Sequence, residues 1–326
     1  MEYTTLGATG LTVSRIALGC GGFGGIGSTP RFFGAGESET EARALMDAAW
    51  EMGITLFDTA DAYGGGRSEE AIGRWLRDRG SEVRSRIVLE TKVFNSVVGD
   101  PSDRGLAPAR VRRQIEGSLS RLGVDHVDLY LIHEPDPRTP VGETLAALDD
   151  LVRAGMVRAI GACNVDAAFL ESARNAGGGQ GAPRFQSIQN AYSLLDRAAE
   201  AEVLPFCARE GLGFTPFSPL AGGWLAGRYR RGTPPPDGSR MTLRPEGGRR
   251  YQNERTFEAL DRLEAAARAR GVDTATLAIA WLLGEPRVSS LIVGPRRPEH
   301  LEPARRALDL KLGANERAEL SALFED

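Results

Sequence analysis

The sequence has few of the residues that build disulfide frameworks or zinc sites. Only three of its 326 residues are cysteines, and only three are histidines. Cys20, Cys163 and Cys207 lie far apart and form no C-x-x-C or Cys/His pair. We therefore expect neither disulfide bonds nor a bound metal, and a reducing cytoplasm is the simplest setting for such a chain.

Long apolar runs and an excess of positive charge are also absent. The longest apolar segment, ATLAIAWLLG at 275–284, is too short for a bilayer span of about 20 residues. The first residues, MEYTTLGATG, lack the basic and apolar regions of a signal peptide. A formal net charge of −4 offers no general field for nucleic acid or anionic lipid. We expect a cytoplasmic protein that binds neither nucleic acid nor a membrane.

Short β-branched runs alternate regularly with longer stretches of helical spacing. The eight runs are 14–20, 54–58, 86–92, 127–133, 157–164, 185–190, 212–218 and 289–294. The amphipathic segments between them include 39–53, 68–80, 107–123, 141–155 and 166–177. This alternation predicts an α/β fold, a (β/α)8 TIM barrel formed by a single domain over residues 1–326.

Four further segments lie outside this alternation of predicted strands and helices. Residues 2–15 alternate around a Gly-Ala-Thr-Gly turn and predict an N-terminal β-hairpin at the barrel floor, whereas 314–324 predict a terminal helix. Two insertions, 21–38 and 227–250, follow the first and seventh predicted strands and would extend βα loops on the functional face of the barrel.

The glycine-rich run at 19–24 fits the pattern G-x-G-x-x-G and suggests a Rossmann fold. A dinucleotide fingerprint must open a helix at once, with an acidic residue about 20 positions later. Here Pro30 and further glycines prevent a helix until about Glu39. We therefore interpret the run as a loop of the barrel.

Polar side chains end five consecutive predicted strands. In a barrel the carboxyl ends of the strands converge on one mouth. Taken singly, each side chain has a structural explanation, such as an ion pair or a core histidine, but together they indicate a functional cluster. The strand-terminal residues are Asp58, Lys92, His133, Asn164, Gln189 and Asn190.

Tyr63 follows Asp58 closely and can reach over the mouth as a proton donor. The pKa of free tyrosine, about 10, suits neutral acid–base catalysis poorly, and a lysine ammonium beside the phenol lowers it. Asp58 would hold Lys92 charged and directed at Tyr63, while His133 would donate to the oxygen that gains charge. This combination suits reduction of a carbonyl.

The cluster contains no hydride source, so a cofactor must supply one. The amides of Asn164, Gln189 and Asn190 can bind a carboxamide, and Phe217 can stack on a flat ring, which together fit nicotinamide. The loops after the last two strands, FSPLAGGWLAG and GPRRPEHLE, suit phosphate binding.

A preference for NADP(H) requires cations near its 2′-phosphate. The loop after the eighth strand supplies Arg297 and Arg296, ahead of Pro298 at an expected helix start. We expect Arg297 to make the main contact and Arg296 to be second.

These motifs, in this order, resemble those of the aldo-keto reductase superfamily. The similar segments are LGATGLTVSRIALGC, FDTADAYGGGRSEEAIG, LETK, LYLIHEPDP, IGACN, IQNAYSLLDR, FTPFSPLAGGWLAGRY and IVGPRRPEHLE. The resemblance implies a monomeric or weakly associating (β/α)8 oxidoreductase that uses NADP(H), without a metal, on a small-molecule carbonyl substrate.

The resemblance also implies roles for individual residues. Tyr63 matches the general acid, Asp58 and Lys92 its partners, and His133 the residue that orients the carbonyl. The implied cofactor-binding residues are Cys163, Asn164, Gln189, Phe217, Ser218, Pro219, Leu220, Gly222, Leu225, Gly294, Arg296, Arg297 and His300.

Some positions depart from the family pattern. Cys163 stands where a serine commonly contacts the carboxamide, and Phe217 replaces the commoner tyrosine. Pro303 and Ala304 stand where the family often has glutamate and asparagine near the adenine, so the strictness of the NADP preference is left open.

Two other functions fit parts of the pattern. A class I aldolase would use Lys92 as a Schiff base, although an Asp58 that keeps the lysine charged argues against it. A non-catalytic nicotinamide-binding regulatory subunit, like the potassium-channel β subunits of the same superfamily, would keep the four catalytic residues. In the superfamily that the sequence resembles, reduction of C=C is associated with an acid in place of the oxygen-orienting histidine, so the retained His133 implies reduction of C=O. The substrate is not specified, although several aromatic residues suggest an aromatic-walled pocket: Phe23, Phe32, Phe33, Phe94 and Trp224.

Overall fold

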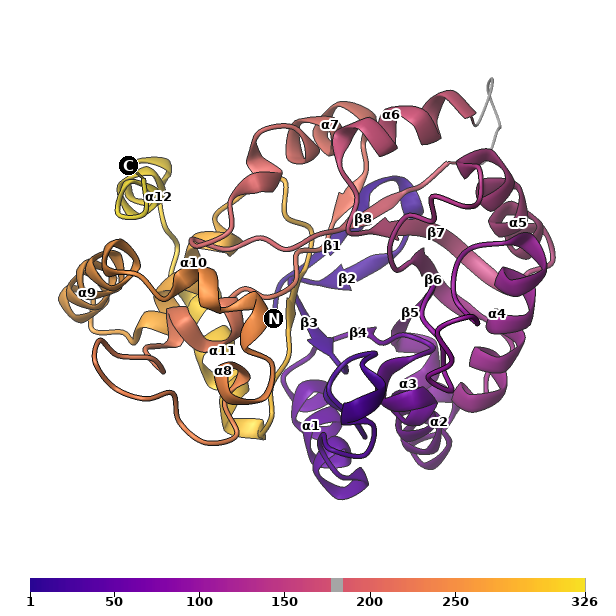
Figure 1. Cartoon of the computed structure of the whole chain (residues 1–326), viewed down its shortest axis with the longest axis horizontal. Helices are drawn as coiled ribbons and strands as arrows, with labels where there is room; N and C mark the ends of the chain where they lie inside the picture. The colour runs from indigo at the N-terminus through magenta and orange to yellow at the C-terminus, as the bar shows by residue number, and fades with distance from the viewer. Residues whose placement is uncertain (177–183, 326) are drawn as a thin grey trace.

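The computed structural model of the chain describes residues 1–176 and 184–325 and is built around an eight-stranded parallel sheet (Figure 1). The strands lie in chain order, except that the last strand lies beside the first. Each overlaps one of the predicted runs. Their bounds are β3 (Ile16–Gly19), β4 (Leu56–Asp58), β5 (Val88–Val93), β6 (Val127–Ile132), β7 (Val157–Cys163), β8 (Ser187–Gln189), β9 (Gly213–Phe214) and β10 (Leu291–Val293).

Backbone hydrogen bonds join the two ends of this sheet. The N–H of Ser289 donates to the carbonyl of Phe214 at 2.8 Å, and the N–H of Ile292 donates to that of Pro216 at 3.0 Å. The segments that carry β9 and β10 therefore lie side by side and complete the ring. The predicted (β/α)8 barrel is confirmed.

Helices surround the barrel (Figure 1). The helix after β3 starts at Glu39, as predicted, because Ser38 and Glu41 form a reciprocal capping box. The predicted amphipathic segment 166–177 ends at Gly177, and that last residue lies outside the described residues. The helices are α1 (Glu39–Glu51), α2 (Arg67–Arg79), α3 (Ser81–Arg86), α4 (Pro108–Leu122), α5 (Val141–Arg153), α6 (Ala167–Ala176), α7 (Val203–Glu210), α8 (Arg240–Leu243), α9 (Glu254–Ala269), α10 (Thr274–Leu283), α11 (Glu302–Asp309) and α12 (Ala314–Ala322).

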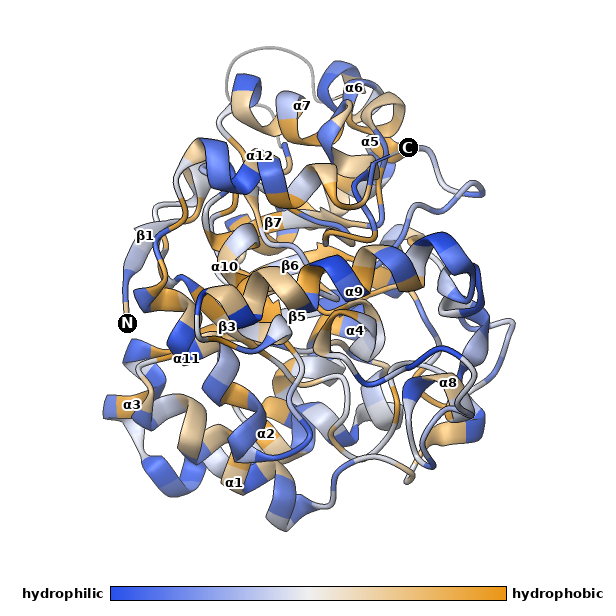
Figure 2. Cartoon of the chain, turned by 90° about the vertical axis from the view of Figure 1, so that its left-hand side faces the viewer, coloured by the Kyte–Doolittle hydropathy of each residue, from blue (hydrophilic) through white to orange (hydrophobic). Residues whose placement is uncertain are grey.

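Two apolar layers hold the fold together. The outer layer lies between helices and strands, where residues such as Val111 and Ile115 of α4 are fully buried. Figure 2 shows hydrophilic residues on the outer turns of α2 and α9 and apolar residues on the strands behind them. This is the division that amphipathic helices around a buried parallel sheet require.

The second apolar layer fills the barrel interior from below. The N-terminal hairpin, β1 (Tyr3–Thr5) paired with β2 (Thr12–Ser14), was predicted and is confirmed. Its Leu6, Leu11 and Val13 pack with inward-facing side chains of the strands. At Gly213 a side chain would collide with Leu6, so the hairpin occupies that space. The hairpin therefore closes the floor, and the opposite end of the barrel remains as the mouth.

Loops from three distant parts of the chain meet beside the mouth. Arg296, in the loop after β10, donates to Glu37 Oε1 at 3.1 Å and to the carbonyl of Gly238 at 2.9 Å. This side chain joins the predicted insertions 21–38 and 227–250 to each other. Among the described helices, none is both long and apolar enough to cross a membrane.

Candidate active site

Four of the strand-end and loop residues singled out in the sequence gather at the mouth. Asp58 ends β4, Lys92 lies near the end of β5, and His133 directly follows β6. Tyr63 begins the short 3-10 helix η3 (Tyr63–Gly66), which turns back over the strands. The parallel register pairs Asp58 with Glu90 and Lys92 with Leu131, so these strand ends lie at neighbouring levels of the barrel.

The Tyr63 hydroxyl lies between a cation and an imidazole. Its oxygen is 3.5 Å from Lys92 Nζ and 3.5 Å from His133 Nε2. The Tyr63 and His133 rings meet edge to face, with their centroids 5.4 Å apart. A carbonyl oxygen placed near the phenol and the imidazole would thus meet two hydrogen-bonding groups at once.

Lys92 is fully buried and held from two sides. Its Nζ donates to Asp58 Oδ1 and, at 2.9 Å, to the carbonyl of Thr59. Burial alone would lower the pKa of Lys92, but the negative charge of Asp58 raises it well above its usual value. The ammonium therefore stays charged, as expected from the sequence.

The acidity of Tyr63 differs from the expectation. Lys92 lowers the pKa of the phenol, as predicted, but burial has a larger effect and raises the pKa above its usual value. Asp58 adds to that rise. Without a further positive charge in the site, Tyr63 is a protonated phenol at neutral pH, suited to donate a proton rather than to accept one.

His133 is a neutral imidazole. Burial, together with the positive charge of Lys92, lowers its pKa to about 3. Its Nδ1 has no hydrogen-bond partner among the described residues, whereas Nε2 faces Tyr63. In the tautomer that carries its proton on Nε2, the ring can donate to an oxygen at the mouth.

The predicted carboxamide-binding residues lie together next to this group. The side chain of Asn164 donates from Nδ2 to the carbonyl of His133 at 2.9 Å and to Cys163 Sγ at 3.3 Å. The amide nitrogen of Gln189 donates to Asp58 Oδ1 at 3.1 Å, and its oxygen accepts from Cys163 Sγ at 3.6 Å. The donor ends of both amides are therefore used within the protein, and the Gln189 oxygen keeps, beside the contact with Cys163, one further lone pair that suits the NH2 group of a carboxamide.

Asn190 does not join them, contrary to the expectation. Its Oδ1 accepts from the N–H of Val165 at 3.1 Å, and its Nδ2 donates to the carbonyl of Val165 at 2.6 Å. Both ends of the amide are used to tie β8 to the loop after β7. Asn190 is a positioning residue of the scaffold, which the sequence could not separate from the adjacent Gln189.

Glu90 is a buried carboxyl group that sequence reasoning missed. Its Oε1 accepts from Gln189 and lies 3.8 Å from Lys92 Nζ. The available signal was its place two residues before Lys92, because alternate residues of a strand face the same side.

The loop after β9 has the backbone shape of a phosphate cradle. Phe217 packs at the top of the interior apolar cluster, and the chain then takes left-handed conformations at Ser218, Ala221 and Gly222. Left-handed residues of this kind occur in loops that bind anions through backbone N–H groups. In this loop the N–H groups of Ala221, Gly223 and Leu225 donate to carbonyls of the loop itself. Pro219 and Leu225 are buried beneath it, and Leu220 packs against the main core.

Arg240 is the second functional candidate missed in the sequence. Its side chain covers Gly222, where an added Cβ would approach Arg240 Cγ to 3.2 Å. Its guanidinium has no ion-pair or hydrogen-bond partner among the described residues. The signal was the arginine-rich composition of the insertion 227–250.

The two predicted arginines of the loop after β10 have different surroundings. Arg296 is already bound to Glu37 and Gly238, and its backbone N–H donates to His300 Nδ1 at 3.2 Å. The Arg297 side chain is 74% exposed and only loosely paired, 3.9 Å from Glu299. Gly294, at the exposed rim, leads into this loop. Of the two guanidinium groups, that of Arg297 is the one free to meet a ligand.

The aromatic residues of the predicted pocket wall differ in exposure. Phe23, Phe94 and Trp224 are buried in the packing of the loops and outer layer. Phe32 and Phe33 remain half-exposed on the loop before α1. An aromatic-walled pocket stays a prediction, with Phe32 and Phe33 its most accessible members.

Comparisons with known proteins agree with this geometry. A model of the aldo/keto reductase family matches residues 15–325. An uncharacterized oxidoreductase, YrpG, of Bacillus subtilis is 36% identical, covering 96% of this chain and 92% of that protein. A probable voltage-gated potassium channel subunit beta of Oryza sativa is 35% identical over 95% and 92% of the two chains. An NADH-specific methylglyoxal reductase of Escherichia coli is 33% identical over 96% and 95%. The chain therefore belongs to the aldo/keto reductase family.

Proposed function

We propose that this chain is an NADP(H)-dependent oxidoreductase that reduces an aldehyde or ketone to an alcohol. The observation that carries the proposal is the Tyr63 hydroxyl, 3.5 Å from both the Lys92 ammonium and the His133 imidazole. A buried phenol between a fixed cation and a neutral hydrogen-bond donor is suited to protonate an oxygen that gains negative charge.

The residues around the mouth fit a nicotinamide dinucleotide. Such a cofactor supplies hydride when bound. The oxygens of Asn164 and Gln189 would hold its carboxamide, Phe217 its ring, and the 218–225 loop with Arg240 its phosphates. The left-handed backbone of that loop and Arg240, whose guanidinium has no partner in the described part of the chain, are the features that favour an anionic ligand there.

Each catalytic side chain has one task in this proposal. His133 Nε2–H holds the substrate carbonyl oxygen at the mouth, and the Tyr63 hydroxyl gives that oxygen its proton. Lys92 stabilises the resulting phenolate, and Asp58 keeps Lys92 charged and in place. In the reverse direction, the phenolate accepts the proton of the alcohol.

Turnover of the purified protein tests the proposal. We would measure oxidation of NADPH and NADH with methylglyoxal, aromatic aldehydes, aldoses and keto-sugars, with and without EDTA. We expect steady turnover that chelation leaves unchanged, and an alcohol as the product of an enone substrate. No turnover with any carbonyl class, or a saturated ketone from the enone, would contradict the proposal.

A regulatory role is the second candidate, because the relatives include probable potassium channel β subunits. A subunit that acts only through a partner would bind NADPH but turn it over with no carbonyl. The same assay therefore separates the two roles. A class I aldolase is disfavoured because the raised pKa of Lys92 keeps its amine protonated and non-nucleophilic.

Trapping with borohydride checks this last point. The sequence contains only two lysines, Lys92 and Lys311. Lys311 is exposed and paired with Glu2, so it reports non-specific labelling. A carbonyl compound trapped on Lys92 and not on Lys311 would favour the aldolase.

A further inference from the structure

Glu90 is a carboxyl group in the catalytic core that the proposed reaction does not use. It lies on β5, two residues before Lys92, and is fully buried. Its Oε1 accepts from Gln189 Nε2, and its Oε2 has no partner among the described residues other than neighbouring Asp58. An ionised carboxylate so poorly bound would cost several kcal/mol.

The groups facing Glu90 come from several elements. Asp58 lies on β4, Lys92 on β5 itself and Gln189 on β8, and the buried thiol of Cys163 on β7 is also under the electrostatic influence of Glu90. One amide nitrogen, that of Gln189, donates to both Asp58 and Glu90. The site thus contains two carboxyl groups and one permanent cation, so a single proton on the carboxyl pair makes it electrically neutral.

We propose that Glu90 is a positioning residue that forms a one-proton carboxyl pair with Asp58. The pair presents a single negative charge to Lys92 and holds the Gln189 amide with its oxygen toward the cofactor pocket. Burial, the charge of Asp58 and a hydrogen bond with its carboxylate raise the pKa of Glu90 well above its usual value, in agreement with this assignment.

The consequence concerns Tyr63. Lys92 lowers the pKa of the phenol, and a second full negative charge beside Lys92 would weaken that effect. A neutral Glu90 leaves Lys92 able to stabilise the phenolate. The carboxyl pair thereby sets the pH at which Tyr63 changes protonation state, through Lys92 and without touching the substrate.

The test uses Glu90→Gln, Glu90→Leu and Asp61→Asn. Glutamine copies a protonated glutamate, whereas leucine keeps the volume but cannot accept from Gln189. Asp61 is another buried carboxyl, but its charged neighbours are Glu69, Arg110 and Arg121 outside the barrel. Asp61→Asn is therefore the matched control for loss of a buried acid.

Three measurements decide the inference. The infrared spectrum near neutral pH should contain a carbonyl band of a protonated carboxyl that is lost in Glu90→Gln, kept in Asp61→Asn and unchanged when the solvent pH changes by one unit. The pH midpoint of alcohol oxidation should move by less than about half a unit in Glu90→Gln and Asp61→Asn. The dissociation constant of NADPH should stay near wild type in Glu90→Gln and rise at least about fivefold in Glu90→Leu.

The opposite results would overturn the inference. They are an unchanged band in Glu90→Gln, a midpoint lowered by about one unit or more because a real charge was removed, or wild-type NADPH affinity in Glu90→Leu. If Glu90→Leu does not fold, the band and the midpoint of Glu90→Gln decide. The inference rests on the proposed function, but the band does not require turnover. An inactive wild-type protein would contradict the function, whereas an active one with these opposite results would contradict the role of Glu90.

Discussion

At the scale of single residues, Tyr63 is the side chain on which the proposed chemistry depends most directly. Tyr63→Phe removes the hydroxyl and leaves the ring, so its edge-to-face contact with His133 remains. We expect turnover to fall by about 10² or more, the usual contribution of acid–base catalysis. The NADPH dissociation constant, measured by tryptophan quenching, should be unchanged. Near-normal turnover would show that another group supplies the proton.

His133 leads to a prediction about pH. Its pKa of about 3, lowered by burial, lies far below that of free histidine at 6.5. The imidazole is therefore neutral on both sides of pH 6.5, and the rate of carbonyl reduction should show no inflection from it between about pH 5 and 8. Initial rates across this range, with His133→Asn as the comparison, are the measurement. An inflection near 6.5 present only in the wild type would contradict a neutral His133.

Asp61 gives a prediction about stability. Neither of its oxygens has a side-chain or backbone partner among the described hydrogen bonds, and burial, followed by the charge of Glu69, raises its pKa well above 3.8. The folded state binds the proton more tightly than the unfolded state, so stability is lost as the pH rises above about 4 toward the folded pKa. Asp61→Asn has no such loss.

The expected result is a stability difference that grows with pH. Relative to wild type, Asp61→Asn should become more stable between pH 5 and pH 8, by at most about 1.4 kcal/mol per pH unit. Urea unfolding at the two pH values measures the change. A difference that stays constant would mean that Asp61 is already ionised in the folded protein.

Sequence reasoning located some site residues and not others for a physical reason. A buried apolar run that ends on Asp58, Lys92 or His133 is visible in the sequence, because strand ends of a barrel must meet. Glu90 lies inside a strand, and whether it faces the core or the helices depends on register. Arg240 depends on how a long loop folds back over Gly222, which no periodicity encodes.

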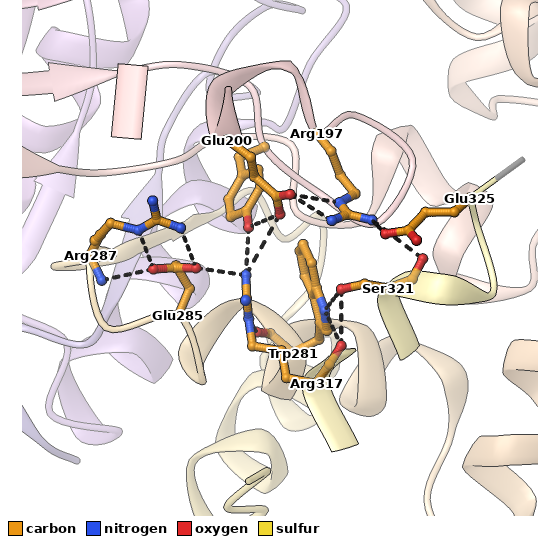
Figure 3. A network of polar contacts seen from close by, with 9 residues as sticks. Arg197, Glu200, Trp281, Glu285, Arg287, Arg317, Ser321 and Glu325 are labelled. Carbon is orange, nitrogen blue, oxygen red and sulfur yellow. Dashed lines mark hydrogen bonds and ion pairs between the residues drawn. The ribbon is translucent and has the colours of Figure 1, made fainter. Parts of the chain in front are cut away.

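At the scale of elements, a network of charged side chains fastens the C-terminal helix α12 to the barrel (Figure 3). Arg317 of α12 donates to Glu285 at 2.8 Å and to the Tyr192 hydroxyl at 2.7 Å, and its guanidinium stacks on Trp281. Tyr192 in turn donates to Glu200 at 2.6 Å. One side chain thus joins α12, α10 and the loop after β8.

We expect Arg317→Ala to lower the free energy of unfolding by about 2–3 kcal/mol, because hydrogen bonds to charged groups are lost while Glu285 stays buried. Arg305→Ala is the control, since Arg305 pairs with Glu302 on the exposed surface of α11. That pair should contribute only about 0–1 kcal/mol. Urea unfolding of both variants makes the comparison, and equal losses would show that the network adds no stability.

The elements themselves were predictable where their pattern was periodic. All eight strands, the hairpin and helices such as α4 follow from alternation or helical spacing. Helices α8 and α10 did not. Residues 275–282 of α10 are buried on every side, so the helix has no polar face to give it a period. α8 is a single turn within a glycine- and proline-rich segment.

At the scale of the whole molecule, the barrel brings together loops that are far apart in the sequence. The hairpin closes one end, and the Arg296 contacts with Glu37 and Gly238 gather three loops beside the other. The family and the barrel were predicted from the sequence and are confirmed. A single domain over residues 1–326, a monomer or weak oligomer, and a cytoplasmic location stay predictions.

We expect the protein to bind NADPH more tightly than NADH. The 2′-phosphate of NADP(H) requires a free cation near the adenosine ribose, and the loop after β10 provides Arg297, whose side chain is 74% exposed. One charge-assisted hydrogen bond contributes about 1.5–3 kcal/mol, which corresponds to roughly 10- to 100-fold tighter binding of NADPH than of NADH. A relative that is NADH-specific shows that the family does not fix this choice.

Two arginine variants separate the phosphate contact from the loop contact. Arg297→Ala should weaken NADPH binding by the same roughly 10- to 100-fold factor and leave NADH binding unchanged, because only NADPH has the phosphate. Arg296→Ala breaks the contacts with Glu37 and Gly238 and should weaken both cofactors alike. Dissociation constants from tryptophan quenching give both ratios. Wild-type protein that binds the two cofactors equally, or an Arg297→Ala variant that keeps its preference, would place the phosphate elsewhere, with Arg240 the next residue to substitute.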